Sequence, residues 1–208
     1  MLNYIRSNTS VIIKGITEHL YLSVLALAIC TLLGVLIGYF VYKRPKIGTA
    51  VLGVFNTLKV IPSLALLLLM LPLLKTGIIP SVTALVMIGI VPVILNTIDG
   101  FTNINPQYLE SGQGMGLSQD QLLKKVQIPL ALPAIFTGVA SSFVQIIASA
   151  TLATYIGGGG LGNIIFTGLN LNRQEMLLTG GLLVAVLSIL GGLFISFLQY
   201  LLIGRKLR

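Results

Sequence analysis

The chain has 208 residues, of which 55% are hydrophobic and only 9% are charged, and its formal net charge at pH 7 is +8. Soluble domains carry about a quarter charged residues, so this composition excludes an ordinary soluble domain and predicts an all-α integral membrane protein. The basic residues stand beside apolar runs and do not line one helix face. This placement is typical of the flanks of membrane spans and argues against nucleic-acid binding.

Residues 1–19 are polar, with isoleucines recurring at near-helical intervals, and we expect them to form an interfacial helix. His19 is the only histidine of the chain. No second histidine, cysteine or carboxylate pair stands at a metal-ligand spacing from it. We therefore expect no metal site and no bound cofactor in this chain, and we interpret His19 as an interfacial residue.

Residues 20–42 contain no charge and predict the first span, because 23 residues make about 34 Å of helix, enough to cross a bilayer. Gly34 and Gly38 have the GxxxG spacing that lets another helix approach closely. A basic cluster of Lys43, Arg44 and Lys46 follows at once.

The second span is expected within residues 50–74 and the third within residues 79–98, close to Asn96. Lys59 leaves two interpretations open. A lysine at membrane depth must face protein or water, which would put Lys59 on a solute pathway. If the span starts nearer Phe55, Lys59 lies at the membrane surface and snorkels.

Residues 105–129 form the one polar interval inside the hydrophobic body of the chain. Asn105 is placed to cap a helix whose first residue is Pro106, and we expect that helix to end near Gly112. Ser118 and Gln121 have the capping-box spacing and predict a second short helix, which a proline at position 129 is expected to end.

The fourth span is expected at residues 130–155. Its polar residues Ser142, Gln145 and Ser149 share one helix face, which fits either helix packing or a path for a polar solute. The glycine run at 157–160 lacks the Lys-Ser/Thr that a phosphate-binding P-loop needs. The last span is expected at residues 176–203.

Five spans would place the two chain ends on opposite sides of the membrane. One side then carries eight basic residues, namely Lys43, Arg44, Lys46, Lys124, Lys125, Arg205, Lys206 and Arg208, and the other carries Arg6, Lys14, Lys75 and Arg173. The positive-inside rule makes the first side cytoplasmic. We therefore expect the N-terminus outside, and the C-terminus and the polar interval in the cytoplasm.

At this point the residues resemble a family. The spacing of the "EAA" loop, found in membrane subunits of binding-protein-dependent ABC importers, is matched by Glu110, Ser111, Gly112, Gly116, Val126, Ile128 and Pro129. Ser111 and Gly112 replace the two alanines of that motif, and Val126 replaces an isoleucine. The strings Ile61-Pro62-Ser63-Leu64-Ala65-Leu66 and Gly-Gly-Leu-Gly resemble the osmoprotectant branch of the same family, and the resemblance covers residues 20–208.

The resemblance implies the permease fold of type I (MetI-like) ABC importers: about five transmembrane helices and a cytoplasmic coupling-helix loop at 105–129. The implied role is uptake of glycine betaine, choline or carnitine, with no enzymatic activity in this chain. The implied partners are a cytoplasmic ATPase subunit that holds ATP and Mg, a second permease subunit, identical or not, and an extracellular solute-binding protein. The implied location is the bacterial cell membrane.

Candidate pathway residues are Lys59, Asn96, Ser142, Gln145 and Ser149. Other functions compete with this one. A permease for methionine or a similar solute shares part of the pattern. An ATP-independent channel or secondary transporter would use Asp99 and Lys59 for gating or ion coupling. A small membrane enzyme is disfavoured by the shortage of His, Asp and Glu.

Overall fold

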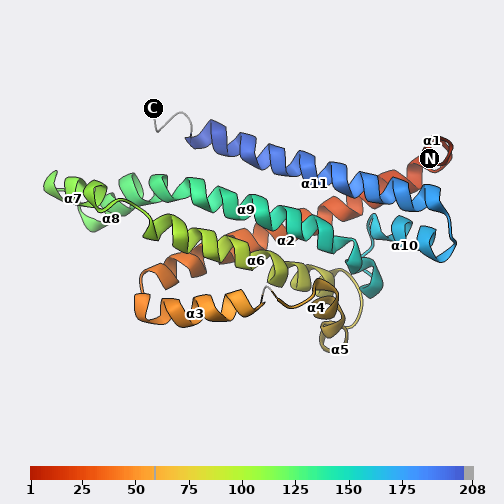
Figure 1. The fold of residues 1–208 in the computed structure, drawn as a ribbon, viewed down its shortest axis with the longest axis horizontal. Helices are drawn as coiled ribbons and strands as arrows, with labels where there is room; N and C mark the ends of the chain where they lie inside the picture. The colour runs from red at the N-terminus through yellow and green to blue at the C-terminus, as the bar shows by residue number, and fades with distance from the viewer. Residues whose placement is uncertain (59, 204–208) are drawn as a thin grey trace.

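The computed structural model describes residues 1–58 and 60–203, and every regular element in these ranges is helical. Figure 1 shows an elongated bundle whose main helices run along its long axis. Four helical stretches of the described chain are long and apolar enough to cross a membrane: α2 (Thr9–Tyr42), α6 (Ile78–Thr102), the stretch Gln119–Ala150 that ends in α9 (Ile128–Ala150), and α11 (Gln174–Ile203). The prediction of an all-α membrane protein is confirmed, and the count of five crossings stays a prediction.

The amino-terminal segment differs from the expected separate helix at 1–19. A short helix α1 (Leu2–Ser7) ends at Asn8, and α2 then continues without a break through His19 into the first span. Residues 9–19 contain no proline, and Gly15 packs against Leu161, so nothing interrupts the helix. At 34 residues α2 is about 51 Å long, longer than the roughly 30 Å of bilayer hydrocarbon. Part of it therefore extends beyond the apolar layer.

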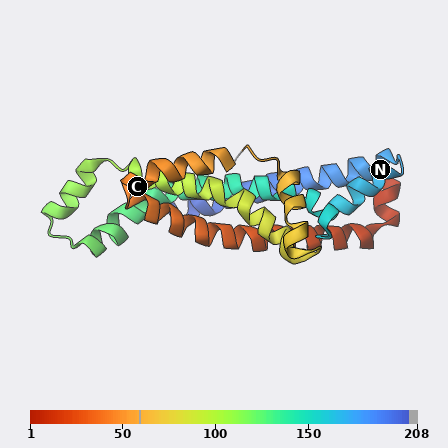
Figure 2. The same ribbon diagram turned by 90° about the horizontal axis from the view of Figure 1, so that it is seen from below.

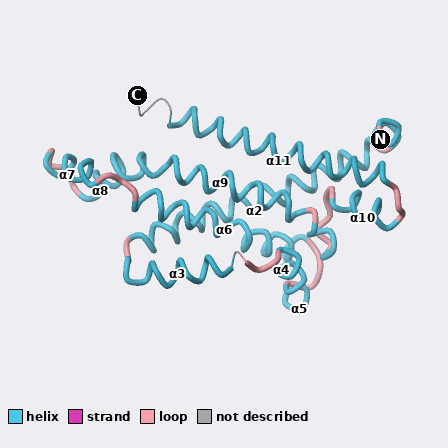
Figure 3. Tube along the Cα trace, in the orientation of Figure 1, coloured by secondary structure: helices cyan, strands magenta, loops and turns pink. Residues whose placement is uncertain are grey.

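The second expected span is not one helix, and this part of the prediction is wrong. The segment consists of α3 (Pro45–Leu58), α4 (Ser63–Leu69) and α5 (Leu71–Leu74), and Figure 3 shows the loop before α4 partway along the bundle. Pro62 stands in that loop with an extended backbone (φ −59°, ψ 133°). A proline has no N–H to donate and disfavours helical geometry in the residue before it, so the helix stops there.

The remaining long helices have different ends from those expected. α6 runs on to Thr102, and within it the side chains of Thr97 and Asn96 donate to the carbonyls of Val93 and Pro92 on the same helix. α9 ends at Ala150 and passes into the 3₁₀ turn η2 (Leu152–Ile156). A further helix, α10 (Gly162–Asn170), fills the connection to α11.

α6 packs tightly against α2 at the predicted GxxxG pair. A Cβ atom on Gly34 would lie 2.8 Å from the Cβ of Val93, and one on Gly38 would lie 2.7 Å from the Cβ of Thr97. Real Cβ atoms do not approach so closely, so only glycine permits this separation of the two helices. The predicted close approach at these two glycines is confirmed.

A neighbouring face of α6 meets α9 in the same way. A Cβ on Gly89 of α6 would lie 2.6 Å from the Cδ1 of Ile146, and one on Gly138 of α9 would lie 2.9 Å from the Pro92 carbonyl oxygen. α6 thus packs against two neighbouring helices. Of its 18 most apolar consecutive residues, 56% are buried. α11 packs on the outer side of α9. Only 6% of its 18 most apolar consecutive residues are buried, which suits a helix that faces lipid.

We predict that Gly34→Leu lowers the thermal stability of the detergent-solubilised protein. Overpacking a close helix contact costs about 1 to 3 kcal/mol, because the new side chain would push α2 away from Val93. Gly53→Leu is the matched control, since a Cβ at Gly53 of α3 has no neighbour within 4 Å. Equal melting temperatures for the two variants would show that the α2–α6 approach does not stabilise the fold.

Candidate functional site

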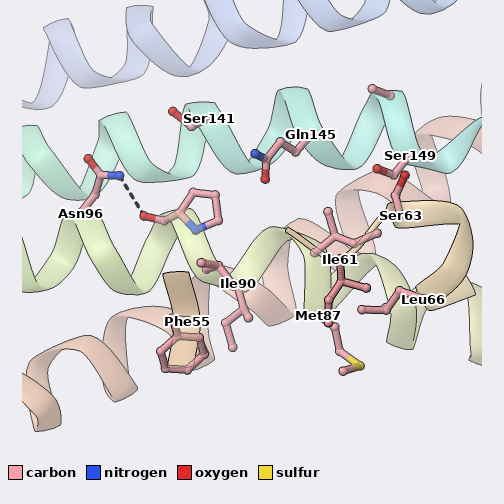
Figure 4. A pocket seen from close by; sticks show the side chains of 14 residues that line it. Phe55, Ile61, Ser63, Leu66, Met87, Ile90, Asn96, Ser141, Gln145 and Ser149 are labelled. Atoms are coloured by element: carbon pink, nitrogen blue, oxygen red, sulfur yellow. Dashed lines mark hydrogen bonds between the residues drawn. The ribbon is translucent and has the colours of Figure 1, made fainter. Parts of the chain in front are cut away.

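A polar cavity of about 640 Å³ lies between α6, α9 and the segment that joins α3 to α4 (Figure 4). Amide and hydroxyl groups gather on one wall and apolar side chains on the other. The lining consists of Phe55, Ile61, Ser63, Leu66, Met87, Ile88, Ile90, Val91, Pro92, Asn96, Ser141, Gln145, Ala148 and Ser149. All these described lining residues are neutral.

One face of α9 supplies the main polar wall of the cavity. Ser141, Gln145 and Ser149 are spaced four residues apart, so they lie one above the other on that face. Figure 4 shows the three side chains on successive turns of α9. Ser141 and Gln145 are exposed to the cavity. Ser149, at the end of the cavity farther from the start of α9, is buried, with 7% of its surface exposed. A solute in the cavity would meet a ladder of hydrogen-bonding groups.

Asn96 adds an amide from α6, and Pro92 sets its orientation. The Asn96 Nδ2 donates to the Pro92 carbonyl at 2.9 Å (Figure 4). This bond uses the amide nitrogen, so Oδ1 is the atom that Asn96 presents as an acceptor. Pro92 has no N–H to donate to the carbonyl of Ile88, which also lines the cavity. The proline thus weakens the backbone pairing of α6 beside the cavity.

Three of the five predicted pathway residues, Asn96, Gln145 and Ser149, lie together on this cavity. Ser142 is not among the residues that line it. It is fully buried, and its Oγ lies 3.2 Å from the Cys30 Sγ of α2. Ser142 therefore belongs to helix packing, the other interpretation of the polar face. Lys59 lies outside the described residues.

Two polar residues of the cavity, Ser141 and Ser63, were not among the predicted pathway residues. Ser141 stands four residues before Gln145, and that spacing alone could have placed it on the same face as Ser149. Ser63 is the first residue of α4, and only the fold brings it beside α9. No local signal in the sequence relates Ser63 to residues more than 70 positions away.

At one end of the bundle, α7 (Pro106–Gly114) and α8 (Gln119–Leu122) form a hairpin that protrudes beyond the other helices (Figure 2). The predicted caps are both present. The Asn105 side chain accepts from the Gln107 N–H at 3.0 Å. Ser118 and Gln121 make both bonds of the capping box, at 2.9 and 3.3 Å. The hairpin is thus ordered by its own backbone partners.

The first hairpin helix ends at Gly114, two residues beyond the predicted end at Gly112. The helix is closed instead by Gly116, whose φ of +79° lies in the left-handed region that glycine adopts without strain. The Leu117 N–H donates to the Gly112 carbonyl at 3.1 Å and the Gly116 N–H to that of Gln113 at 2.9 Å. Gly112 is buried against the Cδ1 of Leu122, so its lack of a side chain serves packing.

The prediction that Pro129 ends the second hairpin helix is wrong. α8 passes through a π-helical turn, η1 (Leu123–Gln127), directly into α9, and Pro129 occupies the first turn of that helix. In the π turn the Ile128 N–H donates to the Leu123 carbonyl five residues back. The wider turn makes room for a proline ring that would clash in a regular helix. The hairpin and the cavity wall are therefore one continuous helical stretch.

The hairpin presents a mixed surface. Glu110, Ser111 and Gly116 are exposed, and so are the apolar side chains of Tyr108 (57%) and Met115 (74%). Exposed apolar groups at the tip of a protruding element are typical of a protein contact. The other residues of the predicted motif, Val126, Ile128 and Pro129, lie at the base of the hairpin, where Val126 and Pro129 are half-buried and Ile128 is 38% exposed.

No group of three His, Cys, Asp or Glu residues that could bind a metal occurs in residues 1–58 and 60–203. A cavity with several polar groups between apolar helices, together with a protruding hairpin at one end, fits a membrane transport subunit. The family described as "binding-protein-dependent transport system inner membrane component" matches residues 8–208. The chain belongs to this family, which confirms the predicted resemblance. Members of the family are membrane components of transport systems. The chain is therefore a transport permease subunit and not an enzyme.

Two relatives illustrate the match. The glycine betaine/carnitine/choline transport system permease protein OpuCB of Bacillus subtilis (strain 168) is 37% identical over 91% of this chain and 88% of its own length. The osmoprotectant import permease protein OsmW of Salmonella typhimurium (strain LT2) is 32% identical over 100% of this chain and 99% of its own length.

Solved structures share the fold at lower identity. A chain of the methionine ABC transporter MetNI, in an inward-facing conformation, superposes with a TM-score of 0.82. The two sequences are 20% identical, and the superposition covers 96% of this chain and 98% of the other. This chain therefore shares its fold with a chain of a solved ABC importer, in agreement with the MetI-like permease fold that the resemblance implies.

Proposed function

We propose that this chain is the transmembrane permease subunit of an ATP-driven importer for quaternary-ammonium osmoprotectants: glycine betaine, choline and carnitine. The observation that carries the proposal is the 37% identity, along 91% of the chain, to a permease named for those three solutes. The osmoprotectant permease that matches from end to end supports the same class of solute.

The cavity is the proposed solute pathway. Its volume of about 640 Å³ is within the roughly 300 to 1,000 Å³ of small-molecule sites. The Gln145 amide can donate a hydrogen bond to a carboxylate of the solute, and the Asn96 Oδ1 can accept one from a hydroxyl group. Phe55 and Met87 on the opposite wall offer apolar contact, and the aromatic ring of Phe55 suits a quaternary ammonium group, which is bulky and weakly hydrated.

The protruding hairpin is the proposed contact with a cytoplasmic ATPase subunit. Glu110 and Met115 are exposed at this end, and no nucleotide-binding motif occurs in the sequence, so ATP and Mg would bind to the partner. Because α8, the π turn and α9 are continuous, a displacement of the hairpin is transmitted along α9 to Gln145. ATP hydrolysis on the partner would in this way reshape the cavity.

A second permease subunit, identical or not, is the proposed partner across the cavity. Ser141, Gln145 and Ala148 line the cavity and remain exposed in the single chain. A pathway that crosses a membrane must be enclosed by protein, so a facing subunit is required to cover this side. The extracellular binding protein implied by the family would deliver the solute to the completed pathway.

The proposed orientation places the hairpin in the cytoplasm of a bacterial cell and the N-terminus outside. Basic residues near the hairpin end of the described chain are Lys43, Arg44, Lys46, Lys124 and Lys125, and those near the other end are Arg6, Lys14, Lys75 and Arg173. Arg205, Lys206 and Arg208 lie outside the described residues, and the sequence predicts them on the hairpin side. With these three included, the hairpin side carries more basic residues, so the positive-inside rule favours this orientation.

A permease for methionine is the second candidate, because the methionine importer chain shares the fold with a TM-score of 0.82. At 20% identity that likeness concerns the fold alone. Membership in a binding-protein-dependent family favours an importer over an ATP-independent channel. Asp99, a candidate gating residue for such a channel, lies outside the cavity lining and accepts a hydrogen bond from Asn103 at 3.1 Å.

We predict ATP-dependent uptake of radiolabelled glycine betaine by vesicles that contain this chain, its ATPase and its binding protein. Unlabelled choline or carnitine should compete, and methionine should not, because only the first two share the quaternary ammonium group. Vesicles without the ATPase are the control. Competition by methionine alone would contradict the proposed solute class, and uptake without the ATPase would contradict the importer.

We also predict that Glu110→Lys and Gly116→Val abolish uptake and weaken co-purification of the ATPase. The first reverses a charge on the exposed hairpin. The second places a β-branched residue at a φ of +79°, which costs about 1 to 2 kcal/mol and deforms the turn.

Gly114→Val is the matched control, because Gly114 has open space around it and no positive φ. All three variants should insert into the membrane at the level of the unmodified protein. Full uptake in Glu110→Lys and Gly116→Val would end the assignment of the hairpin to ATPase contact.

A further inference from the structure

The glycine run Gly157–Gly160 follows η2 at the end of the bundle opposite to the hairpin (Figure 1). Gly157, Gly159 and Gly160 have φ values of +80°, +78° and +88°, so each occupies a conformation that other residues rarely adopt. Such a backbone persists only when its surroundings hold it. The sequence gives no phosphate-binding role to this run, and its contacts show what it does instead.

Glu18 of α2 holds the carboxyl end of the run. Its Oε2 accepts a hydrogen bond from the Gly160 N–H at 2.9 Å. A Cβ on Gly159 would lie 2.7 Å from the same oxygen, so the loop backbone lies directly against the carboxylate. Lys14 lies one turn earlier at 3.8 Å from the other carboxylate oxygen. The Glu18 side chain is 36% exposed, so the bond lies at the protein surface.

His19, the next residue, holds the helix that precedes the run. It is fully buried, in contrast to the interfacial position expected from the sequence, and its Nε2 lies 3.1 Å from the Ile147 carbonyl oxygen of α9. A carbonyl only accepts, so Nε2 carries the proton and donates. Two adjacent residues of α2 therefore form hydrogen bonds to the two ends of the segment 147–160.

A third element joins at the same place. The Gly77 N–H, just before α6, donates to the Ile156 carbonyl at 2.7 Å. The Thr154 Oγ1 of η2 donates to the Gly159 carbonyl of the run at 3.0 Å. The segment thus connects α2, α6 and α9 next to Ser149, at the end of the cavity farthest from the hairpin.

We propose that Glu18 is a positioning residue for transport: its bond to Gly160 anchors the glycine run to α2 and so fixes the end of α9 against which the hairpin works. A lever transmits motion to the cavity only if one end is held. Without the anchor, displacement of the hairpin would rotate the whole of α9 instead of opening the cavity around Gln145. The proposal rests on the transport role of the chain and not on the identity of the solute.

Three variants of the assembled transporter test the anchor. Glu18→Ala removes the acceptor, whereas Glu18→Gln keeps a side-chain oxygen that can accept from Gly160. Thr17→Ala is the matched control, because Thr17 is the neighbouring exposed residue and its hydroxyl bonds only to Lys14 of its own helix. Hydrogen exchange is measured over residues 155–165, and glycine betaine uptake is measured together with ATP hydrolysis.

In Glu18→Ala we expect exchange roughly tenfold faster and confined to residues 155–165, as the loss of a charged hydrogen-bond partner predicts, together with less solute transported per ATP hydrolysed, because the end of α9 would no longer be fixed. Glu18→Gln should recover most of that ratio, and Thr17→Ala should match the unmodified protein. A ratio unchanged in Glu18→Ala would overturn the proposal. Exchange raised throughout the chain, or not raised in the loop, would also overturn it. The exchange comparison needs no solute, so it stands if the assignment of glycine betaine fails.

Discussion

The close approach of α6 to α2 and α9 is the constraint on which the rest of the structure depends. In lipid a helix satisfies its own backbone groups, and helices associate by packing where small residues let them approach. Gly34 and Gly38 on one face of α6, and Gly89 with Gly138 on a neighbouring face, leave no room between these helices for larger side chains. Asn96 borders the contact of α6 with α9 beside Gly138, and Gln145 lies on the exposed face of α9, so the cavity opens directly beside these packed helices.

The two ends of the three-helix bundle differ in how they are connected. The hairpin lies at one end, continuous with α9 through the π turn, and the glycine run lies at the other end, gripped by Glu18 and His19 of α2. The cavity lies between them, and the weakened backbone pairing at Pro92 gives α6 a place to bend beside it. If a partner subunit displaces the hairpin as proposed, α9 would carry that displacement past its polar face to the cavity, because its other end is bonded to α2.

Local chemistry explains which features could be predicted from the sequence. The caps at Asn105 and Ser118 and the helix approach at Gly34 and Gly38 depend on a few neighbouring residues, and they are present as expected. The hairpin's continuation past Pro129 depends on a π turn that no residue pattern announces. Periodicity placed a polar face on α9, but two adjacent faces share that spacing, and only packing against Cys30 shows that Ser142 belongs to the buried one. The burial of His19 likewise depends on a carbonyl 128 positions away.

The most direct test of this account is the reactivity of a cysteine at position 145 in the assembled transporter, measured with a water-soluble maleimide without nucleotide and with ATP trapped on the ATPase. The native Cys30 is buried, and a cysteine at position 97 provides a buried reference, because Thr97 is fully buried. The account predicts that the rate for Gln145→Cys changes several-fold between the two states, while the rate for Thr97→Cys stays low in both. Equal rates for Gln145→Cys in the two states would show that work on the hairpin does not reach the cavity.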